Sequence, residues 1–168
     1  MKKAILSLGS NIGDRKAFIK RALQCLSKEI TIKKISSIYE SCSLLKDGQN
    51  DYYNIAISAE TNYTPEEFLL FIKEVETSVG RLDRGKWLPR EIDIDIIDYN
   101  GEVICNEFIC IPHKLMHKRS FVLYPLRDIC VNYMHPVSRK HINNMINNLS
   151  DKLEIKKVGE IYGNFNNL

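Results

Sequence analysis

Long apolar runs and repeated segments are both missing from this sequence. No stretch approaches the roughly 18 apolar residues that a membrane-spanning helix needs, and no internal repeat or low-complexity tract is present. The apolar start, residues 4–8, is broken at once by Gly9-Ser10-Asn11, which argues against a signal peptide. We therefore expect a protein that has no membrane partner.

Cysteines are also few, and the net charge is small. The five cysteines are odd in number and form no C-x-x-C pair, so neither a disulfide framework nor a thiolate zinc site is predicted, and we expect a reducing cytoplasm. The 24 Lys and Arg residues only slightly exceed the 21 Asp and Glu residues. This surplus is too small to predict a nucleic-acid surface. An anionic ligand would therefore have to be bound by a local cluster of Lys and Arg side chains.

The pattern of apolar residues predicts one α+β domain over 1–168. A chain of 168 residues can bury a single core without covalent support. Hydrophobic spacing predicts strands and helices in the order 3–9 (strand), 14–29 (helix), 31–40 and 52–60 (strands), 65–79 (helix) and 91–98 (strand). This order is typical of a ferredoxin-like βαββαβ sandwich with an antiparallel sheet. Additional helical segments are expected within 112–130 and 138–149.

Turn and capping residues support these boundaries. Thr64, Pro65 and Glu67 form the pattern of a capping box at a helix start, and Gly80 marks the end of that helix. The pair Asn100-Gly101 predicts a tight hairpin turn, with 102–105 returning along the preceding strand. Residues 9–14 lack the Lys-Ser/Thr of a P-loop, so we interpret them as a turn and helix cap.

Acidic residues alternate with isoleucine over residues 91–96. In a strand this places Glu91, Asp93 and Asp95 on one face. That face could simply be solvated. Aspartate is a poor strand former, however, and neighbouring like charges repel each other, so this arrangement favours a bound cation. Oxygen ligands with no His or Cys beside them favour Mg²⁺ over zinc.

Basic residues precede and follow these carboxylates. The ten residues of 81–90 contain four cations and the only tryptophan of the chain, namely Arg81, Arg84, Lys86, Trp87 and Arg90. Cations beside a pair of metal-type carboxylates suggest a polyphosphate, whose charge two Mg²⁺ ions would largely offset. The alternative is a solvated basic loop with Trp87 packed against the protein. Further along, His113 and Arg119 are candidate donors to phosphate oxygens.

Taken together, these motifs resemble the hydroxymethyl-dihydropterin pyrophosphokinase family. The resemblance covers about residues 1–130, and its most specific part is the W-x-P-R-x-x-D-x-D pattern of residues 87–95. It also rests on Leu8-Gly9-Ser10-Asn11, Tyr52-Tyr53-Asn54, Gly80-Arg81, Pro112-His113, Arg119-Ser120-Phe121 and Pro125-Leu126. The resemblance implies the same ferredoxin-like fold. It implies a monomeric enzyme that transfers pyrophosphate from ATP to the hydroxymethyl group of 6-hydroxymethyl-7,8-dihydropterin in folate synthesis.

The resemblance also implies roles for individual residues. Asp93 and Asp95 would hold two Mg²⁺ ions, and the catalytic residues would be Arg81, Arg90 and Asp95. The ATP contacts would be Glu76, Arg81, Arg84, Arg90, Ile96, His113 and Arg119. The pterin contacts would be Ser41, Cys42, Leu44, Tyr52, Asn54, Trp87 and Phe121. The aromatic rings of Tyr52 and Phe121 would stack on the pterin, and the amide of Asn54 would bond its polar edge.

Some positions depart from the family pattern, and two other functions stay open. Cys42 and Ser43 stand where prolines are common, Leu88 where glycine is frequent, and Lys114 where tyrosine is frequent. A catalytically impaired pterin- or nucleotide-binding protein would retain the same charged residues. A ferredoxin-like sheet can also bind single-stranded RNA through strand aromatics, but strand 91–96 presents carboxylates, which repel phosphate unless a metal is bound.

Overall fold

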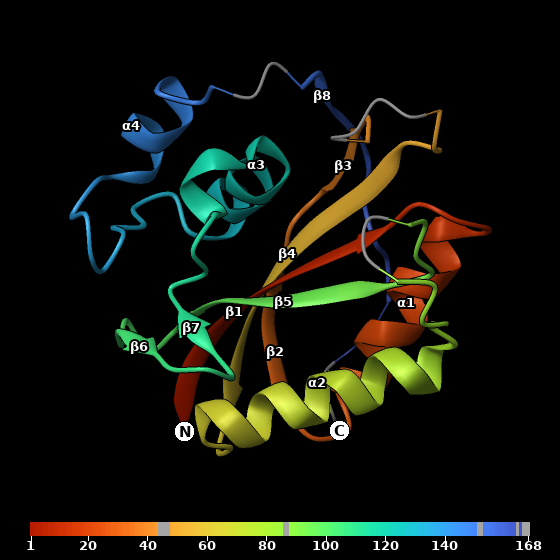
Figure 1. Ribbon diagram of the computed structural model, residues 1–168, viewed down its shortest axis with the longest axis horizontal. Coiled ribbons are helices and arrows are strands. Elements are labelled where there is room, and N and C mark those ends of the chain that lie inside the picture. The colour runs from red at the N-terminus through yellow and green to blue at the C-terminus, as the bar shows by residue number, and fades with distance from the viewer. Residues whose placement is uncertain (44–47, 86–87, 151–152, 164, 166–168) are drawn as a thin grey trace.

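The computed structural model describes residues 1–43, 48–85, 88–150, 153–163 and 165 (Figure 1). Its elements, in chain order, are β1 (Lys2–Ser10), α1 (Arg15–Leu26), β2 (Thr31–Ile35), β3 (Ile38–Ser41), β4 (Tyr52–Thr61), α2 (Pro65–Val79), β5 (Asp93–Tyr99), β6 (Ile104–Cys105), β7 (Cys110–Ile111), the 3₁₀ helix η1 (Met116–Lys118), α3 (Ser120–Ile129), α4 (Ile142–Asn147) and β8 (Ile155–Gly159). Within these ranges, no helix has the length and apolar content that crossing a membrane requires.

The main sheet has the strand order β5-β1-β4-β3-β8, and β2 also pairs with β4. Each pairing in it is antiparallel. The first strand of the chain thus lies between the β4 and β5 strands, and the β2–β3 segment flanks β4 on its other side. This is the split βαβ arrangement, so the predicted ferredoxin-like sandwich is confirmed.

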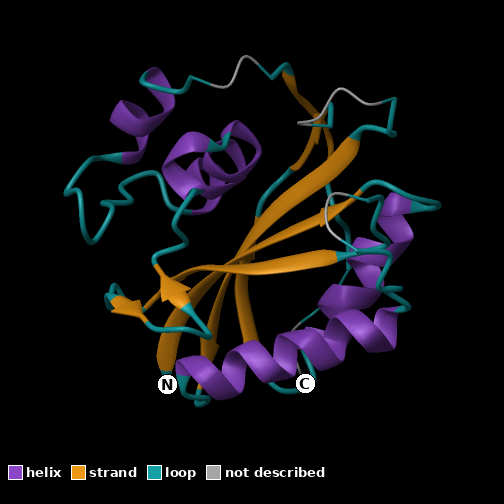
Figure 2. Cartoon of the chain, in the orientation of Figure 1, coloured by secondary structure: helices purple, strands orange, loops and turns teal. Residues whose placement is uncertain are grey.

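The two faces of the sheet are covered differently (Figures 1 and 2). On one face, α1 and α2 pack against the sheet through a large buried cluster that includes Leu6, Leu8, Ile55, Ile57, Ile94, Ile19, Leu23, Phe68 and Ile72. On the other face, α3 and α4 pack against a smaller cluster that includes Ala56, Ile97, Leu123, Leu126 and Met145. Because side chains alternate along a strand, Ser7, Asn54, Asp93 and Asp95 fall on the α3 face.

The predicted caps are present. Asp14 accepts a hydrogen bond from the backbone N–H of Ala17 at 2.9 Å, which confirms the predicted helix cap. Strand β1 runs through Ser10, so the turn before the helix is limited to residues 11–14. The side chains and backbones of Thr64 and Glu67 form the reciprocal capping box of α2. Gly80 ends α2 at φ +106, a left-handed conformation that glycine adopts without steric cost.

Two of the expectations about strands are wrong, one about a boundary and one about a pairing. Residues 31–40 form two strands rather than one, because Ser36 interrupts the ladder and its hydroxyl accepts the backbone N–H of Ala56 at 2.9 Å. The Asn100-Gly101 turn forms, with Glu102 N–H donating to Tyr99 O at 2.9 Å. The segment after it does not return along β5, because β6 pairs with β7 instead.

Two segments also differ from their predicted boundaries, and one strand was not predicted. The strand that carries the aspartates begins at Asp93, so Glu91 lies before it. The predicted helix 138–149 is limited to Ile142–Asn147. The edge strand β8 was not predicted. Its sequence Ile-Lys-Lys-Val-Gly has little apolar alternation, and charged residues of this kind are common on edge strands.

Candidate active site

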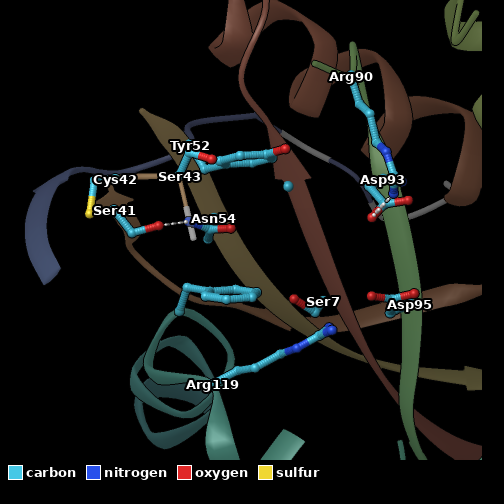
Figure 3. Close-up of a pocket in the computed structure, with 12 residues that line it drawn as sticks. Ser7, Ser41, Cys42, Ser43, Tyr52, Asn54, Arg90, Asp93, Asp95 and Arg119 are labelled. Carbon is cyan, nitrogen blue, oxygen red and sulfur yellow. Dashed lines mark hydrogen bonds and ion pairs between the residues drawn. The ribbon is translucent and has the colours of Figure 1, made fainter. Parts of the chain in front are cut away.

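A cavity of about 130 Å³ opens on the α3 face of the sheet (Figure 3). Its walls come from β1, β3, β4, β5 and the start of α3, together with the segments just after β3 and just before β5. The lining residues are Ser7, Gly9, Ser41, Cys42, Ser43, Tyr52, Asn54, Arg90, Asp93, Asp95, Arg119 and Phe121. Nine of the predicted site residues are therefore brought together, namely Ser41, Cys42, Tyr52, Asn54, Arg90, Asp93, Asp95, Arg119 and Phe121.

Strand register explains how the two ends of the cavity meet. Gly9 on β1 is paired with Asn54 on one side and with Asp93 on the other. Ser7 is paired with Asp95. A Cβ atom on Gly9 would lie 3.2 Å from Oδ1 of Asn54, so glycine leaves room for the amide between the strands.

One end of the cavity combines an amide with an aromatic ring. The Asn54 side chain is 3% exposed and donates from Nδ2 to the hydroxyl of Ser41 at 3.0 Å. Figure 3 shows the ring of Tyr52 on the same side of the cavity as Asn54. Phe121 lines the same cavity, and the guanidinium carbon of Arg119 lies 5.6 Å from the centre of its ring. This end can hold a flat heterocycle with a polar edge.

The other end of the cavity is a charged cluster around Asp93. Its two carboxylate oxygens accept hydrogen bonds from different arginines, Oδ1 from Arg81 at 2.6 Å and Oδ2 from Arg90 at 2.8 Å. Burial, reinforced by the negative charge of Asp93, raises the pKa of Asp95. A cation close to these two carboxylates would oppose both effects.

Glu76 supports this cluster from α2. It is 2% exposed and accepts hydrogen bonds from Arg81 at 2.5 Å, from Lys73 at 2.9 Å and from the backbone N–H of Ile94 at 2.7 Å. Burial alone would lower the pKa of Arg81, but Asp93 and Glu76 outweigh it and raise that pKa. Glu76 thus holds both Arg81 and the backbone between the two aspartates.

The carboxylates fit a hard divalent cation. Asp93 and Asp95 offer oxygen ligands only, which suits Mg²⁺. In the part of the chain that the structure describes, no three His, Cys, Asp or Glu side chains converge as a metal-binding group. Two carboxylates leave most coordination positions open, and a polyphosphate could supply oxygen ligands there.

Other predicted residues lie outside the cavity lining. Arg84 donates to both carboxylate oxygens of Glu91, at 2.9 and 2.5 Å, and these bonds lower the pKa of Glu91 to about 2. Glu91 lies before β5, and its carboxylate binds Arg84 rather than the arginines bound by Asp93. The expectation that Glu91 shares a strand face with the two aspartates is therefore wrong. Ile96 is buried in the core on the α1–α2 side of the sheet. The predicted pterin contacts Leu44 and Trp87 fall outside the described residues.

His113 follows β7, and the charges of Asp95 and Asp93 influence its pKa. Its backbone N–H donates to Ile97 O at 3.0 Å. Burial lowers the pKa of His113, although the charge of Asp95 acts in the opposite direction.

Sequence reasoning missed the contribution of β1 to the cavity. Ser7 and Gly9 line it and alternate with the buried Leu6 and Leu8. This alternation was visible in the sequence, but the register that places Ser7 beside Asp95, and Gly9 between Asn54 and Asp93, was not. Ser43 also lines the cavity, and it belongs to the segment 41–44 that the resemblance places beside the pterin.

The chain is similar to known proteins of one family. Residues 5–131 match the family 7,8-dihydro-6-hydroxymethylpterin-pyrophosphokinase. A 2-amino-4-hydroxy-6-hydroxymethyldihydropteridine pyrophosphokinase of Aquifex aeolicus is 45% identical over 140 residues, which is 83% of this chain and 88% of that protein. A protein of the same name from Bacillus subtilis is 38% identical over 129 residues, covering 76% of this chain and 77% of its own length.

Larger proteins contain a similar region. The folic acid synthesis protein FOL1 of Dictyostelium discoideum is 41% identical over 94% of this chain, which corresponds to 23% of that protein. A crystal structure of Plasmodium falciparum HPPK-DHPS superposes with a TM-score of 0.69 at 19% identity, over 88% of this chain and 43% of that one. This chain thus spans less than half of the solved protein, and the likeness supports the fold.

Proposed function

Because the chain belongs to the 7,8-dihydro-6-hydroxymethylpterin-pyrophosphokinase family, we propose that its cavity binds the pterin at the Asn54 end and Mg²⁺-ATP at the Asp93–Asp95 end. The reaction is the transfer of a pyrophosphoryl group from ATP to 6-hydroxymethyl-7,8-dihydropterin, a step of folate synthesis. The observation that carries the placement is the register of β1, in which Gly9 lies between Asn54 and Asp93.

The Asn54 end suits the pterin. An amide buried beside Ser41 can present both a donor and an acceptor to the polar edge of the heterocycle. Tyr52 and Phe121 line the cavity as aromatic faces, against which a flat ring gains contact area. The hydroxymethyl group of a pterin held in this way would extend towards Asp93 and Asp95.

The charged end suits the triphosphate. Asp93 and Asp95 would hold two Mg²⁺ ions, which would neutralise phosphate charge and orient the hydroxymethyl oxygen for in-line attack. Arg119 lines the cavity, and we propose that its guanidinium group and the side chain of His113 contact phosphate oxygens. The chain's own contribution is positioning and charge stabilisation, which account for most of the acceleration in phosphoryl transfer.

Arg81 and Arg90 would change partners during this reaction. Both arginines bond to Asp93 in the structure. If Asp93 ligates a cation, the guanidinium groups are released and become available to the phosphate oxygens, where negative charge develops in the transition state. Arg84 would join them after leaving Glu91. Glu76 would act on the nucleotide side through Arg81, and Ile96, whose side chain is buried on the other face, would meet the nucleotide through its backbone.

Assembly and location belong to the same proposal. We infer a monomer, as the resemblance to the family implies. We also infer a cytoplasmic protein, since the five cysteines are odd in number and form no C-x-x-C pair.

The direct test is incubation with ATP, Mg²⁺ and 6-hydroxymethyl-7,8-dihydropterin, followed by chromatographic separation of AMP from ADP. AMP and a pterin diphosphate are expected. ADP would indicate an ordinary kinase. If no nucleotide is consumed although calorimetry detects binding of both substrates, the chain is the catalytically impaired binding protein. The Asp95→Ala variant is expected to lose activity by orders of magnitude while its circular dichroism spectrum is unchanged.

A further inference from the structure

Two of the five cysteines face each other in a small hairpin. The strands β6 and β7 pair antiparallel, with Cys105 opposite Cys110. Their sulfur atoms lie 2.8 Å apart. Figure 1 shows this hairpin as a separate pair of short strands beside the main sheet. The C-x₄-C spacing alone does not indicate a pair, so it is the strand register that brings the two thiols together.

The backbone of the hairpin already has the spacing that a disulfide needs. Hydrogen-bonded and non-hydrogen-bonded pairs alternate along an antiparallel ladder. Asn106 donates its backbone N–H to Ile109 O at 2.9 Å, so the adjacent pair of cysteines is of the non-hydrogen-bonded kind. The Cα atoms of such a pair are about 4.5 Å apart, within the roughly 4.4–6.8 Å that a disulfide spans. A covalent bond therefore needs no rearrangement of the chain.

The two thiols are accessible to a small oxidant. Cys105 is exposed and Cys110 is partly exposed, and the hairpin tip between them carries the exposed Phe108. The hydrogen bond with Cys105 raises the pKa of the Cys110 thiol. An oxidant from solution would therefore first meet the sulfur of Cys105, and Cys110 would act second.

We propose that Cys105 and Cys110 form a reversible disulfide, a thiol-redox site that is separate from the pyrophosphoryl-transfer site. With a low-molecular-weight disulfide as the oxidant, the Cys105 thiolate attacks one of its sulfur atoms and releases one small thiolate. The Cys110 thiolate then attacks the Cys105 sulfur of this mixed disulfide and releases the second small thiolate. The two protein thiols lose two protons and two electrons, and the oxidant is reduced to two thiols.

The hairpin is directly connected to a residue of the candidate active site. β7 ends at Ile111, and two residues later His113 is anchored by its backbone N–H to Ile97 O at 3.0 Å. Ile111 itself is 1% exposed and belongs to the core. The disulfide would thus restrict the chain immediately before His113 without altering the buried core.

The test is oxidation of the native protein with oxidised glutathione, followed by alkylation of the remaining thiols and intact-mass analysis. We expect a mass loss of about 2 Da before alkylation, corresponding to two hydrogen atoms. The number of alkylated thiols should fall from the five of the reduced chain by two. Peptide mapping should link Cys105 to Cys110, and dithiothreitol should restore all the thiols. A wild-type protein that keeps every thiol, or that only accumulates a glutathione adduct, would overturn the proposal.

Serine variants distinguish this pair from other pairings. Cys105→Ser and Cys110→Ser should each acquire a glutathione adduct instead of losing about 2 Da, because the second thiolate that resolves the mixed disulfide is gone. Cys25→Ser, on α1, is the matched control and should behave as the wild type. If Cys105→Ser still forms an intramolecular disulfide under native conditions, the hairpin is not the site. Circular dichroism of each variant checks that the comparison is made on folded protein.

Discussion

Asn54 is the residue through which the proposed pterin side of the cavity can be tested most directly. Its amide is buried and donates to Ser41. Replacing Asn54 by alanine is expected to weaken pterin binding by about 1–3 kcal/mol, roughly 5- to 150-fold, because the polar edge of the heterocycle loses its hydrogen-bonding partner. Calorimetric titration with the pterin, and separately with an ATP analogue and Mg²⁺, measures both affinities.

The nucleotide affinity of Asn54→Ala should be unchanged. Asn50→Ala is a matched control, because Asn50 is exposed and lies outside the cavity lining. Unchanged pterin affinity combined with weakened nucleotide affinity would place Asn54 on the wrong side of the cavity.

Glu76 is a positioning residue in this structure rather than a ligand-binding one. It bonds to Arg81, to Lys73 and to the backbone between the two aspartates. Glu76→Gln removes the charge while keeping the size, so Arg81 loses its buried partner. We expect kcat to fall about 10- to 100-fold and the free energy of unfolding to fall by roughly 1–3 kcal/mol. The pterin dissociation constant should stay the same, because Glu76 does not line the cavity.

Steady-state kinetics, pterin titration and urea denaturation test the three parts of this prediction. The control is Glu74→Gln on the same helix, whose side chain is exposed. A reduced stability with a normal kcat would mean that Glu76 stabilises the fold but does not position Arg81 for catalysis.

At the scale of elements, local signals predicted what short segments do but not which segments they contact. The capping box, the glycine that ends α2 and the turn at Asn100 are each determined by a few adjacent residues, and all were correct. The partner of 104–105 was not, because two apolar residues carry too little pattern to distinguish β5 from β7. The family resemblance located most of the cavity residues, whereas Ser7 and Gly9 required the strand register.

The segment just before β5 is a second place where a local sequence pattern did not predict a contact. Alternation placed Glu91 with the aspartates, but the strand starts after it, and the nearby Arg84 and the backbone N–H of Leu82 bind its carboxylate instead. A contact across a loop depends on the loop's conformation, which the alternation of residue types does not encode.

This segment predicts a dependence of stability on pH. The pKa of Glu91 in the folded state, about 2, lies below its usual 4.5. The ion pair with Arg84 therefore contributes its full stability above about pH 4.5, and that contribution is lost as the pH falls towards 2. The difference in unfolding free energy between the wild type and Glu91→Gln should be largest near neutral pH and should shrink over this window.

Urea denaturation followed by circular dichroism at a series of pH values gives this difference directly. Glu107→Gln, at an exposed position, should show a small difference that does not vary with pH. A difference between the wild type and Glu91→Gln that stays constant from pH 6 to about 2 would contradict the assignment of the lowered pKa to Glu91.

At the scale of the whole molecule, the site exists because α3 covers only part of its face of the sheet. Positions on this face are apolar where α3 packs, as at Ile5, Ala56 and Ile97. Further along the same strands they become small or polar and line the cavity, at Ser7, Gly9, Asn54, Asp93 and Asp95. One set of strands thus supplies both core and active site, and the change from apolar to polar along each strand marks the edge of the helix.

The molecule also brings two arginines from outside the sheet onto one carboxylate, and in the proposed reaction we expect this arrangement to make metal binding depend on the nucleotide. Arg81 follows α2 and Arg90 precedes β5, and both bond to Asp93. A divalent cation that binds without nucleotide must displace these guanidinium groups while no phosphate is present to accept them. Removing one arginine should therefore strengthen the binding of the cation alone, since it frees a carboxylate oxygen and removes a repelling charge.

We expect Arg81→Met and Arg90→Met to bind Mn²⁺ about 5- to 30-fold more tightly than the wild type when no nucleotide is present, equivalent to about 1–2 kcal/mol. Both variants should still turn over more slowly, because in the proposed reaction the same guanidinium groups bind the phosphate oxygens. Electron paramagnetic resonance of free Mn²⁺ measures the affinity without any catalysis. Arg84→Met, whose guanidinium bonds to Glu91 instead of Asp93, is the matched control and should leave Mn²⁺ affinity unchanged. If the Asp93-bound arginine variants bind Mn²⁺ no better than this control, the arginines do not compete with the metal, and the exchange of partners proposed for Asp93 is wrong.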